Sequence, residues 1–150
     1  MAALSDSIEK FIKQLMQDSN ILELKRNELA QYFACAPSQI NYVLATRFSV
    51  DRGYITESHR GGGGYVKLIR VSSGQTDTLE ALMQRIGGEI DYESVCRILA
   101  RLAESKLITP REARIMRSGA ACDGIPIGAK DAVRAVIFKN MLMQVFREED

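Results

Sequence analysis

Apolar side chains recur at helical spacing in the first part of the chain. One stripe near the N-terminus consists of Ile8, Phe11, Ile12, Leu15 and Met16. Ser5 or Ser7 is predicted to cap the helix that carries this stripe, and Asn27 to cap a second helix. A turn then leads to Pro37, which suits the first turn of a third helix because its missing N–H would be unpaired there anyway. The pattern therefore predicts three short helices.

The hydrophobic period changes after the third helix. The segments 54–58 and 65–71 are rich in β-branched and aromatic residues and flank a run of four glycines, Gly61 to Gly64, so they predict a β-hairpin. A shorter alternating stretch at 21–24 predicts one more strand. Helix, strand, helix, turn, helix and hairpin, in this order, form the layout of a winged helix-turn-helix domain.

The polar stretch SSGQTD follows the hairpin and is the best linker candidate. We therefore predict a winged helix-turn-helix domain at 1–73 and a helical domain at 74–150. The second domain reads as helical throughout, and Thr109-Pro110-Arg111-Glu112 is a capping box with Pro at the first helical position. A loop from Ser118 to about Gly128 precedes the last helix, which is apolar on more than one side and indicates a subunit interface. The predicted fold is mainly α with a small β-wing, and the helical bundle serves dimerisation and regulation.

Composition narrows the function classes. The chain has 46% hydrophobic and 26% charged residues, which argues against wholesale disorder. Short apolar runs and an N-terminus without an apolar signal core predict a cytoplasmic protein that neither enters a membrane nor is secreted. Three cysteines and one histidine leave little to build a disulfide framework or a metal site, so neither a metal nor a cofactor is expected. Cys122 falls in a loop and can be an exposed thiol.

Catalytic residues are not expected. His59 is the only imidazole and has no sequence sign of a Ser or Cys partner. Acidic pairs such as Glu148-Glu149 lie at the terminus of the sequence, where a solvated tail is the simpler interpretation. The sequence therefore predicts a binding protein and not an enzyme.

The third helix is the candidate reader of DNA, because short polar side chains near a helix N-terminus can meet base edges in the major groove. Gln39 and Asn41 can each form a bidentate pair with adenine. Ser38 and Thr46 suit phosphates or bases, Arg47 suits guanine or the backbone, and Tyr42 shares their face. The alternative is a solvated face, or a winged-helix adaptor that binds proteins and has no DNA function.

The glycine run is the sharpest local feature. A two-residue hairpin turn needs at most one or two glycines, so four indicate close approach of the backbone to a partner such as a narrow minor groove. Arg60 can insert there or bind phosphate, while His59 and Lys67 add to the tip. A floppy loop at a hairpin end is the alternative. The complete predicted DNA-binding set is Ser38, Gln39, Asn41, Tyr42, Thr46, Arg47, His59, Arg60, Gly61, Gly62, Gly63, Gly64, Tyr65 and Lys67.

Charge is distributed unevenly behind a net value of +1. Residues 36–71 include five basic and two acidic side chains, a net charge of +3. The chain from residue 75 onward has eleven basic and twelve acidic residues, a net charge of −1. Overall neutrality therefore does not exclude a nucleic-acid partner. The local basicity is modest, so binding is expected to rely on two copies of the domain.

The segment PSQINYVLATRFSVDRGYITESHRGGGGYVKLIRV closely resembles the CtsR family, the class III stress gene repressors of low-GC Gram-positive bacteria, and LITPREARIMRS resembles the C-terminal domain of that family. The resemblance implies a homodimer that binds double-stranded DNA at tandem direct repeats and represses heat-shock genes of the Clp protease and chaperone operons.

The resemblance also implies regulation. In the family, the glycine-rich wing is a thermosensor that releases DNA on heating. A McsB-type protein-arginine kinase and the Clp protease are implied as partners. Arg60 matches the wing arginine and is the first candidate phosphosite, since phosphorylation would replace a phosphate-seeking cation with negative charge.

Overall fold

The computed structural model describes residues 2–59 and 64–149. It divides into two compact units: unit 1 comprises Met1–Asp77 together with Arg147–Asp150, and unit 2 comprises Thr78–Phe146. The chain thus leaves unit 1 after Asp77 and returns to it at Arg147, a return that the sequence did not predict. The domain boundary between residues 73 and 74 stays a prediction.

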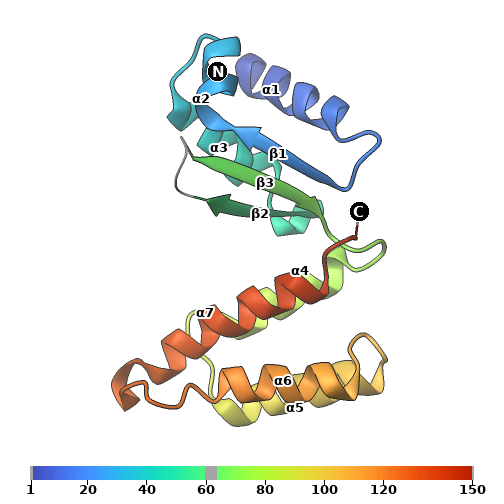
Figure 1. Cartoon of the computed structure of the whole chain (residues 1–150), viewed down its shortest axis with the longest axis vertical. Helices are drawn as coiled ribbons and strands as arrows, with labels where there is room; N and C mark the ends of the chain where they lie inside the picture. Colours follow the sequence, from blue (N-terminus) through green and yellow to red (C-terminus); the bar gives the residue numbers. More distant parts are fainter. Residues whose placement is uncertain (1, 60–63, 150) are drawn as a thin grey trace. The chain divides into compact units, whose positions relative to one another are not determined.

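Unit 1 combines three helices with a three-stranded antiparallel sheet (Figure 1). The elements are α1 (Ala2–Leu15), β1 (Ile21–Lys25), α2 (Arg26–Tyr32), α3 (Pro37–Arg47), the 3-10 turn η1 (Val50–Arg52), β2 (Tyr54–His59) and β3 (Tyr65–Arg70). The strand order is β1-β3-β2, so the predicted hairpin β2–β3 is confirmed and β1 completes the sheet on the other side of β3.

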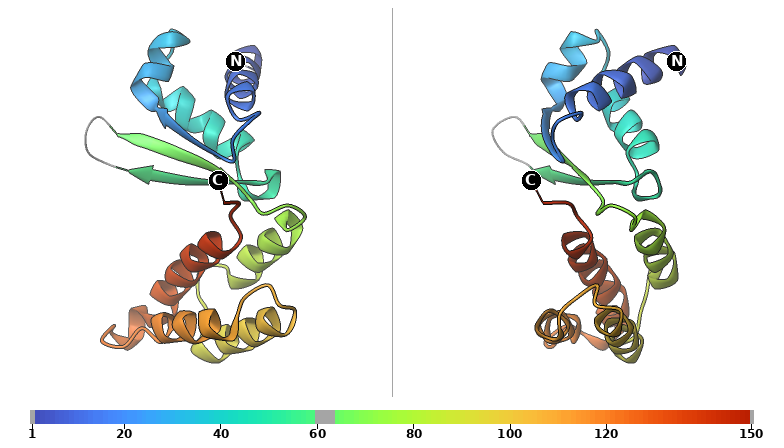
Figure 2. Two further views of the ribbon diagram at one scale, coloured as in Figure 1. Left: turned by 45° about the vertical axis from the view of Figure 1, so that its right-hand side comes forward. Right: turned by 90° about the vertical axis from the view of Figure 1, so that its right-hand side faces the viewer.

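The core of unit 1 lies between the helices and one sheet face. Figure 2 shows α1, α2 and α3 on the same side of the sheet. Alternation along each strand directs Leu24, Val66 and Leu68 to this face, where all three are buried. The helical residues of this buried cluster are Ile8, Ile12, Met16, Leu29, Ala30, Ile40, Val43 and Leu44, with Phe48 directly after α3. Of the apolar stripe predicted for the first helix, Ile8, Ile12 and Met16 are buried in this core and Phe11 packs against it, whereas Leu15 is 46% exposed.

Two predicted caps are wrong. α1 begins at Ala2, so Ser5 and Ser7 lie inside the helix, and the Ser7 hydroxyl donates to the Ala3 carbonyl at 2.9 Å. α2 begins at Arg26 with Lys25 at its N-cap, because β1 runs into the helix without a loop that would place Asn27 at the cap. The chain therefore turns from strand to helix within one residue.

Unit 2 is helical in the part of the chain that the structure describes. Its helices are α4 (Thr76–Ile86, whose first two residues belong to unit 1), α5 (Tyr92–Glu104), α6 (Pro110–Ala120) and α7 (Ile127–Val145). The capping box is confirmed, since the Thr109 hydroxyl accepts from the Glu112 N–H at 3.0 Å and the Glu112 carboxylate accepts from the Thr109 N–H at 2.8 Å. The predicted mainly α fold with a small sheet is thereby confirmed.

The connection between α6 and α7 differs from the expectation. α6 continues to Ala120 and α7 starts at Ile127, so the loop is shorter than the predicted one. Arg134 is 4% exposed and binds this region from α7, donating to the Ala120 carbonyl at 2.6 Å and to the Asp131 carboxylate at 2.6 Å. Cys122, expected as an exposed thiol, is 6% exposed and therefore a packing residue.

Candidate nucleic-acid interface

Helix α3 separates an apolar face from a polar one. It buries Ile40, Val43 and Leu44 against the core, while Ser38, Asn41 and Thr46 are exposed on its other side and Gln39 is half-buried. Tyr42 is also exposed, with 57% of the surface of the residue accessible. The turn between α2 and α3 is closed by hydrogen bonds from Ala34 N–H to the Gln31 carbonyl and from Cys35 N–H to the Ala30 carbonyl, at 3.1 and 2.9 Å. The sequence therefore produces a helix-turn-helix whose second helix presents polar side chains to solvent.

The hydroxyl of Thr46 has an internal partner. It donates to the Tyr42 carbonyl at 2.7 Å, one helical turn earlier. This bond uses the hydroxyl's single donor, so toward DNA Thr46 can offer the lone pairs of that oxygen, or its methyl group for apolar contact with thymine.

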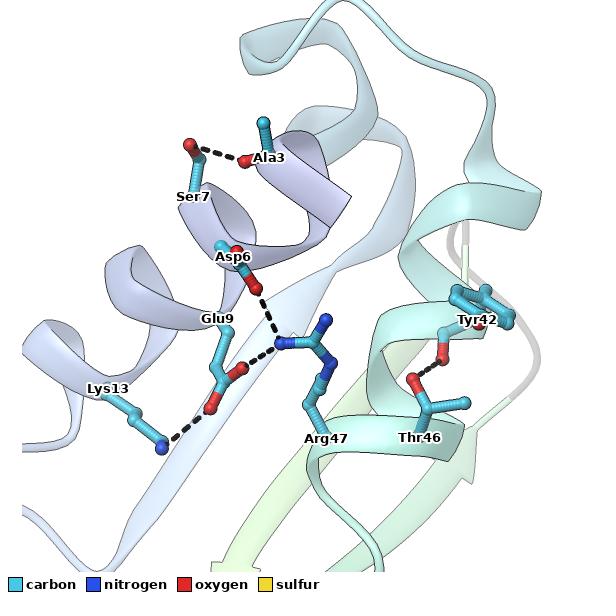
Figure 3. Close-up of polar contacts among 8 residues, drawn as sticks. All are labelled: Ala3, Asp6, Ser7, Glu9, Lys13, Tyr42, Thr46 and Arg47. Atoms are coloured by element: carbon cyan, nitrogen blue, oxygen red, sulfur yellow. Dashed lines mark hydrogen bonds and ion pairs between the residues drawn. The ribbon is translucent and has the colours of Figure 1, made fainter. Parts of the chain in front are cut away.

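Arg47 points toward α1, whereas Tyr42 and Thr46 lie farther from that helix (Figure 3). The Arg47 guanidinium lies 2.8 Å from the Asp6 carboxylate and 2.6 Å from the Glu9 carboxylate. Glu9 in turn pairs with Lys13 at 2.7 Å. Hydrogen bonds from Lys13 and from Arg47 hold the pKa of Glu9 below its ordinary value. The Arg47 side chain thus fastens α1 to α3 in the free protein.

The hairpin positions the second group of predicted contacts. The rings of His59 and Tyr65 are stacked, with centroids 4.8 Å apart and an angle of 18° between the planes. Lys67 is directly opposite Glu57 on one side and Glu23 on the other, so the three lie in one row across the sheet. Gly64 has a φ of +72°, a left-handed conformation that favours glycine. Arg60 and Gly61 to Gly63, which are central to the predicted site, lie outside the described residues.

Arg26, which the sequence analysis did not single out, lies beside the hairpin. From the start of α2, its Nη2 donates to the Ser58 hydroxyl on β2 at 2.8 Å. A Cβ added at Gly64 would lie 3.7 Å from Arg26 Nη1, so the guanidinium is next to the other arm of the hairpin as well. Arg26 therefore connects the helix-turn-helix to both arms of the wing. The adjacent pair Lys25-Arg26 at the junction of strand and helix was the available sequence signal.

Internal pairing also changes the local charge. Arg47 is paired with two carboxylates, and Arg70 donates to the Met16 carbonyl at 2.7 Å while its guanidinium lies 5.9 Å from the centre of the Tyr54 ring. Lys67 is placed between two acidic positions. Arg52 and Lys25 are exposed. Asp6 and Glu9, which pair with Arg47, lie outside residues 36–71, so the net +3 counted along the sequence overstates the positive charge that this surface presents.

No helix in the described part of the chain is long and apolar enough to cross a membrane. Within residues 2–59 and 64–149, no group of three or more His, Cys, Asp or Glu side chains could hold a metal ion. The three cysteines are unpaired thiols.

Comparison with known proteins identifies the family. Residues 3–72 match the CtsR N-terminal HTH domain, and residues 74–143 match the CtsR C-terminal dimerization domain. The transcriptional regulator CtsR of Geobacillus stearothermophilus is 42% identical over 147 residues, which cover 95% of this chain and 96% of that protein. The transcriptional regulator CtsR of Bacillus subtilis strain 168 is 39% identical over 144 residues, which cover 93% of this chain and 94% of that protein.

A crystal structure of CtsR in complex with a 26-base-pair DNA duplex matches with 41% identity over 95% of this chain and 97% of that chain, with a TM-score of 0.47. The curated relatives are named as transcriptional regulators, in agreement with the prediction that the chain is not an enzyme. By both of its domains and by the extent of identity with these relatives, the chain belongs to the CtsR family.

Proposed function

We propose that this chain is a dimeric, sequence-specific DNA-binding repressor of heat-shock genes, including those of the Clp protease and chaperone system, and that it acts in the cytoplasm. The observation that carries the proposal is the exposed polar face of α3, which buries its opposite face and follows the turn of a helix-turn-helix. A helix of this kind can enter the major groove, where Gln39 and Asn41 can read adenine.

Base contacts are assigned to α3 and backbone contacts to its surroundings. Ser38, Tyr42 and Thr46 share the exposed side of the helix with Asn41. The wing contributes His59, Arg60 with the glycines that follow it, Tyr65 and Lys67. Arg47 is assigned a DNA contact that competes with Asp6 and Glu9, since its guanidinium already pairs with both.

Heat release is assigned to the glycine-rich wing. A glycine loses more conformational entropy than any other residue when it becomes ordered. The ordered, DNA-bound conformation of a glycine loop therefore becomes unfavourable readily as temperature rises. Gly64, directly before the second arm, has a φ of +72°, a left-handed conformation that glycine adopts without strain. DNA bound through this wing is therefore released while the rest of unit 1 stays folded.

The proposed partners beyond DNA are a second copy of the chain, a McsB-type protein-arginine kinase and the Clp protease. Dimerisation is supported by the match of residues 74–143 to a dimerization domain and by exposed apolar residues in unit 2, including Ile115, Ile127 and Val136. Arg60 is the proposed phosphosite, because a phosphate there would repel the DNA backbone.

Gel retardation of a duplex that carries tandem direct repeats tests the proposal. The full chain should retard it at low salt, retard a scrambled duplex much less, and lose affinity steeply as salt rises. Arg60→Ala should weaken binding while the circular dichroism spectrum and the dimer stay unchanged. A protein-interaction adaptor built on the same winged helix would retard neither duplex, and this result would replace the repressor by that alternative.

A further inference from the structure

From Arg147 onward, the chain belongs structurally to unit 1. This C-terminal segment, residues 147–149, lies outside both family matches, which end at residues 72 and 143. Arg147 forms an antiparallel β-bridge with Val71, one residue after β3. The Glu148 N–H donates to the Arg70 carbonyl at 2.9 Å, so the segment extends the hydrogen bonding of the sheet at the end of β3.

Further hydrogen bonds hold the segment on both sides. The Ser73 N–H donates to the Glu148 carboxylate at 2.6 Å. The side-chain amide of Asn20 donates to the Glu149 carbonyl at 3.3 Å. Because these bonds use backbone groups of Ser73 and Glu149, the segment has a defined position against the turn before β1 and the chain after β3.

Arg147 extends this connection into the wing. Its Nη1 atom lies 3.3 Å from Glu57 Oε2 on β2, and the two side chains are only 21% and 26% exposed. Partial burial strengthens such a pair relative to one in open solvent. Glu57 lies three residues before Arg60 and in the same row as Lys67 and Glu23.

We propose that Arg147 is a positioning residue for the DNA-reading wing, which it holds through Glu57. The pair fixes the first arm of the hairpin, and it adds a second cation to a row that otherwise has two carboxylates and one lysine. A pre-ordered wing loses less conformational entropy on binding DNA. In the chain, the segment comes shortly after α7, the last helix of unit 2. This proposal rests on the DNA-binding function proposed above.

A double-mutant cycle in the full chain tests whether Arg147 acts through Glu57. Operator affinity is measured for the unmodified chain, Arg147→Gln, Glu57→Gln and the double variant. Arg147→Gln should weaken binding about fivefold, the upper range for one ion pair. When Arg147→Gln is introduced into the Glu57→Gln variant, operator affinity should hardly change further. Glu149→Gln is the matched control, since it removes a charge from the segment and keeps the carbonyl that accepts from Asn20.

An undiminished loss in the Glu57→Gln background would mean that Arg147 touches DNA directly, and this result would overturn the proposal. Amide hydrogen exchange gives a readout that needs no DNA. Arg147→Gln should speed exchange at Glu148 and along β2 while the amides of α5 and α6 stay protected. If the unmodified chain binds no duplex, the proposed function fails, and only hydrogen exchange can then test the positioning role of Arg147. Unchanged protection of the β2 amides in Arg147→Gln would overturn that role.

Discussion

At the scale of single residues, Arg47 shows that a side chain predicted to contact DNA can also stabilise the fold of the free protein. Its guanidinium holds two carboxylates of α1, and together with Lys13 it lowers the pKa of Glu9. A carboxyl group with a lowered folded-state pKa stabilises the fold fully at neutral pH. This stabilisation is lost as pH falls through the folded-state pKa. The helical period of α3 places Arg47 toward α1, but the residue types alone do not reveal that Asp6 and Glu9 are there to meet it.

Arg47→Ala is therefore expected to lower the melting temperature of unit 1 by a few degrees at neutral pH and to raise the pKa of Glu9 part of the way toward its ordinary value. The pKa rises only partly because Lys13, the larger cause of the shift, remains. Thermal unfolding along a descending pH series and an NMR titration of Glu9 measure both effects. The loss of stability caused by Arg47→Ala should become smaller at low pH, where the carboxylates of Asp6 and Glu9 are protonated. Arg52→Ala, which removes an exposed cation from the same unit, should show no such pH dependence.

At the scale of elements, local patterns predicted the helices and the hairpin because their periods are strong. The predicted cap at Asn27 failed because tertiary pairing intervenes: β1 pairs with β3 up to Lys25, and α2 starts at the next residue. The role of Arg26 was missed for the same reason, since its partner Ser58 is distant in sequence. The polar face of α3 was predictable, because burial of Ile40, Val43 and Leu44 determines which side remains exposed.

The hairpin gives a test of local strain at this scale. Gly64 and Gly74 both have left-handed φ values, of +72° and +77°, so alanine at either position costs about 1 kcal/mol. Both substitutions should lower the melting temperature similarly. Only Gly64→Ala, at the junction of the wing and β3, should lower the temperature at which operator DNA is released, because Gly74 lies in the chain after the sheet. Fluorescence anisotropy of a labelled operator during heating measures release. An equal shift in Gly74→Ala would contradict a local thermosensor.

At the scale of the whole molecule, the two units are linked twice by the chain, after Asp77 and before Arg147. A fragment that ends at Val71 therefore lacks the dimerization domain and also the C-terminal segment that bonds to unit 1. Weak DNA binding by such a fragment would not distinguish loss of the dimer from loss of the segment. Substitutions in the full chain separate the two causes.

Dimerisation through unit 2 is best tested on its exposed apolar side chains. Ile115, Ile127 and Val136 are 60%, 89% and 60% exposed, so changing all three to Asp removes no buried packing within the chain. If they are covered in a dimer, each contributes on the order of 1 kcal/mol or more, and the triple variant should sediment as a monomer with an unchanged helical spectrum. Operator affinity should then fall roughly 100-fold, since two linked recognition domains bind far more tightly than one. Leu15→Asp, at an exposed apolar position in unit 1, should leave the dimer intact. A triple variant that remains dimeric would place the interface elsewhere in the chain.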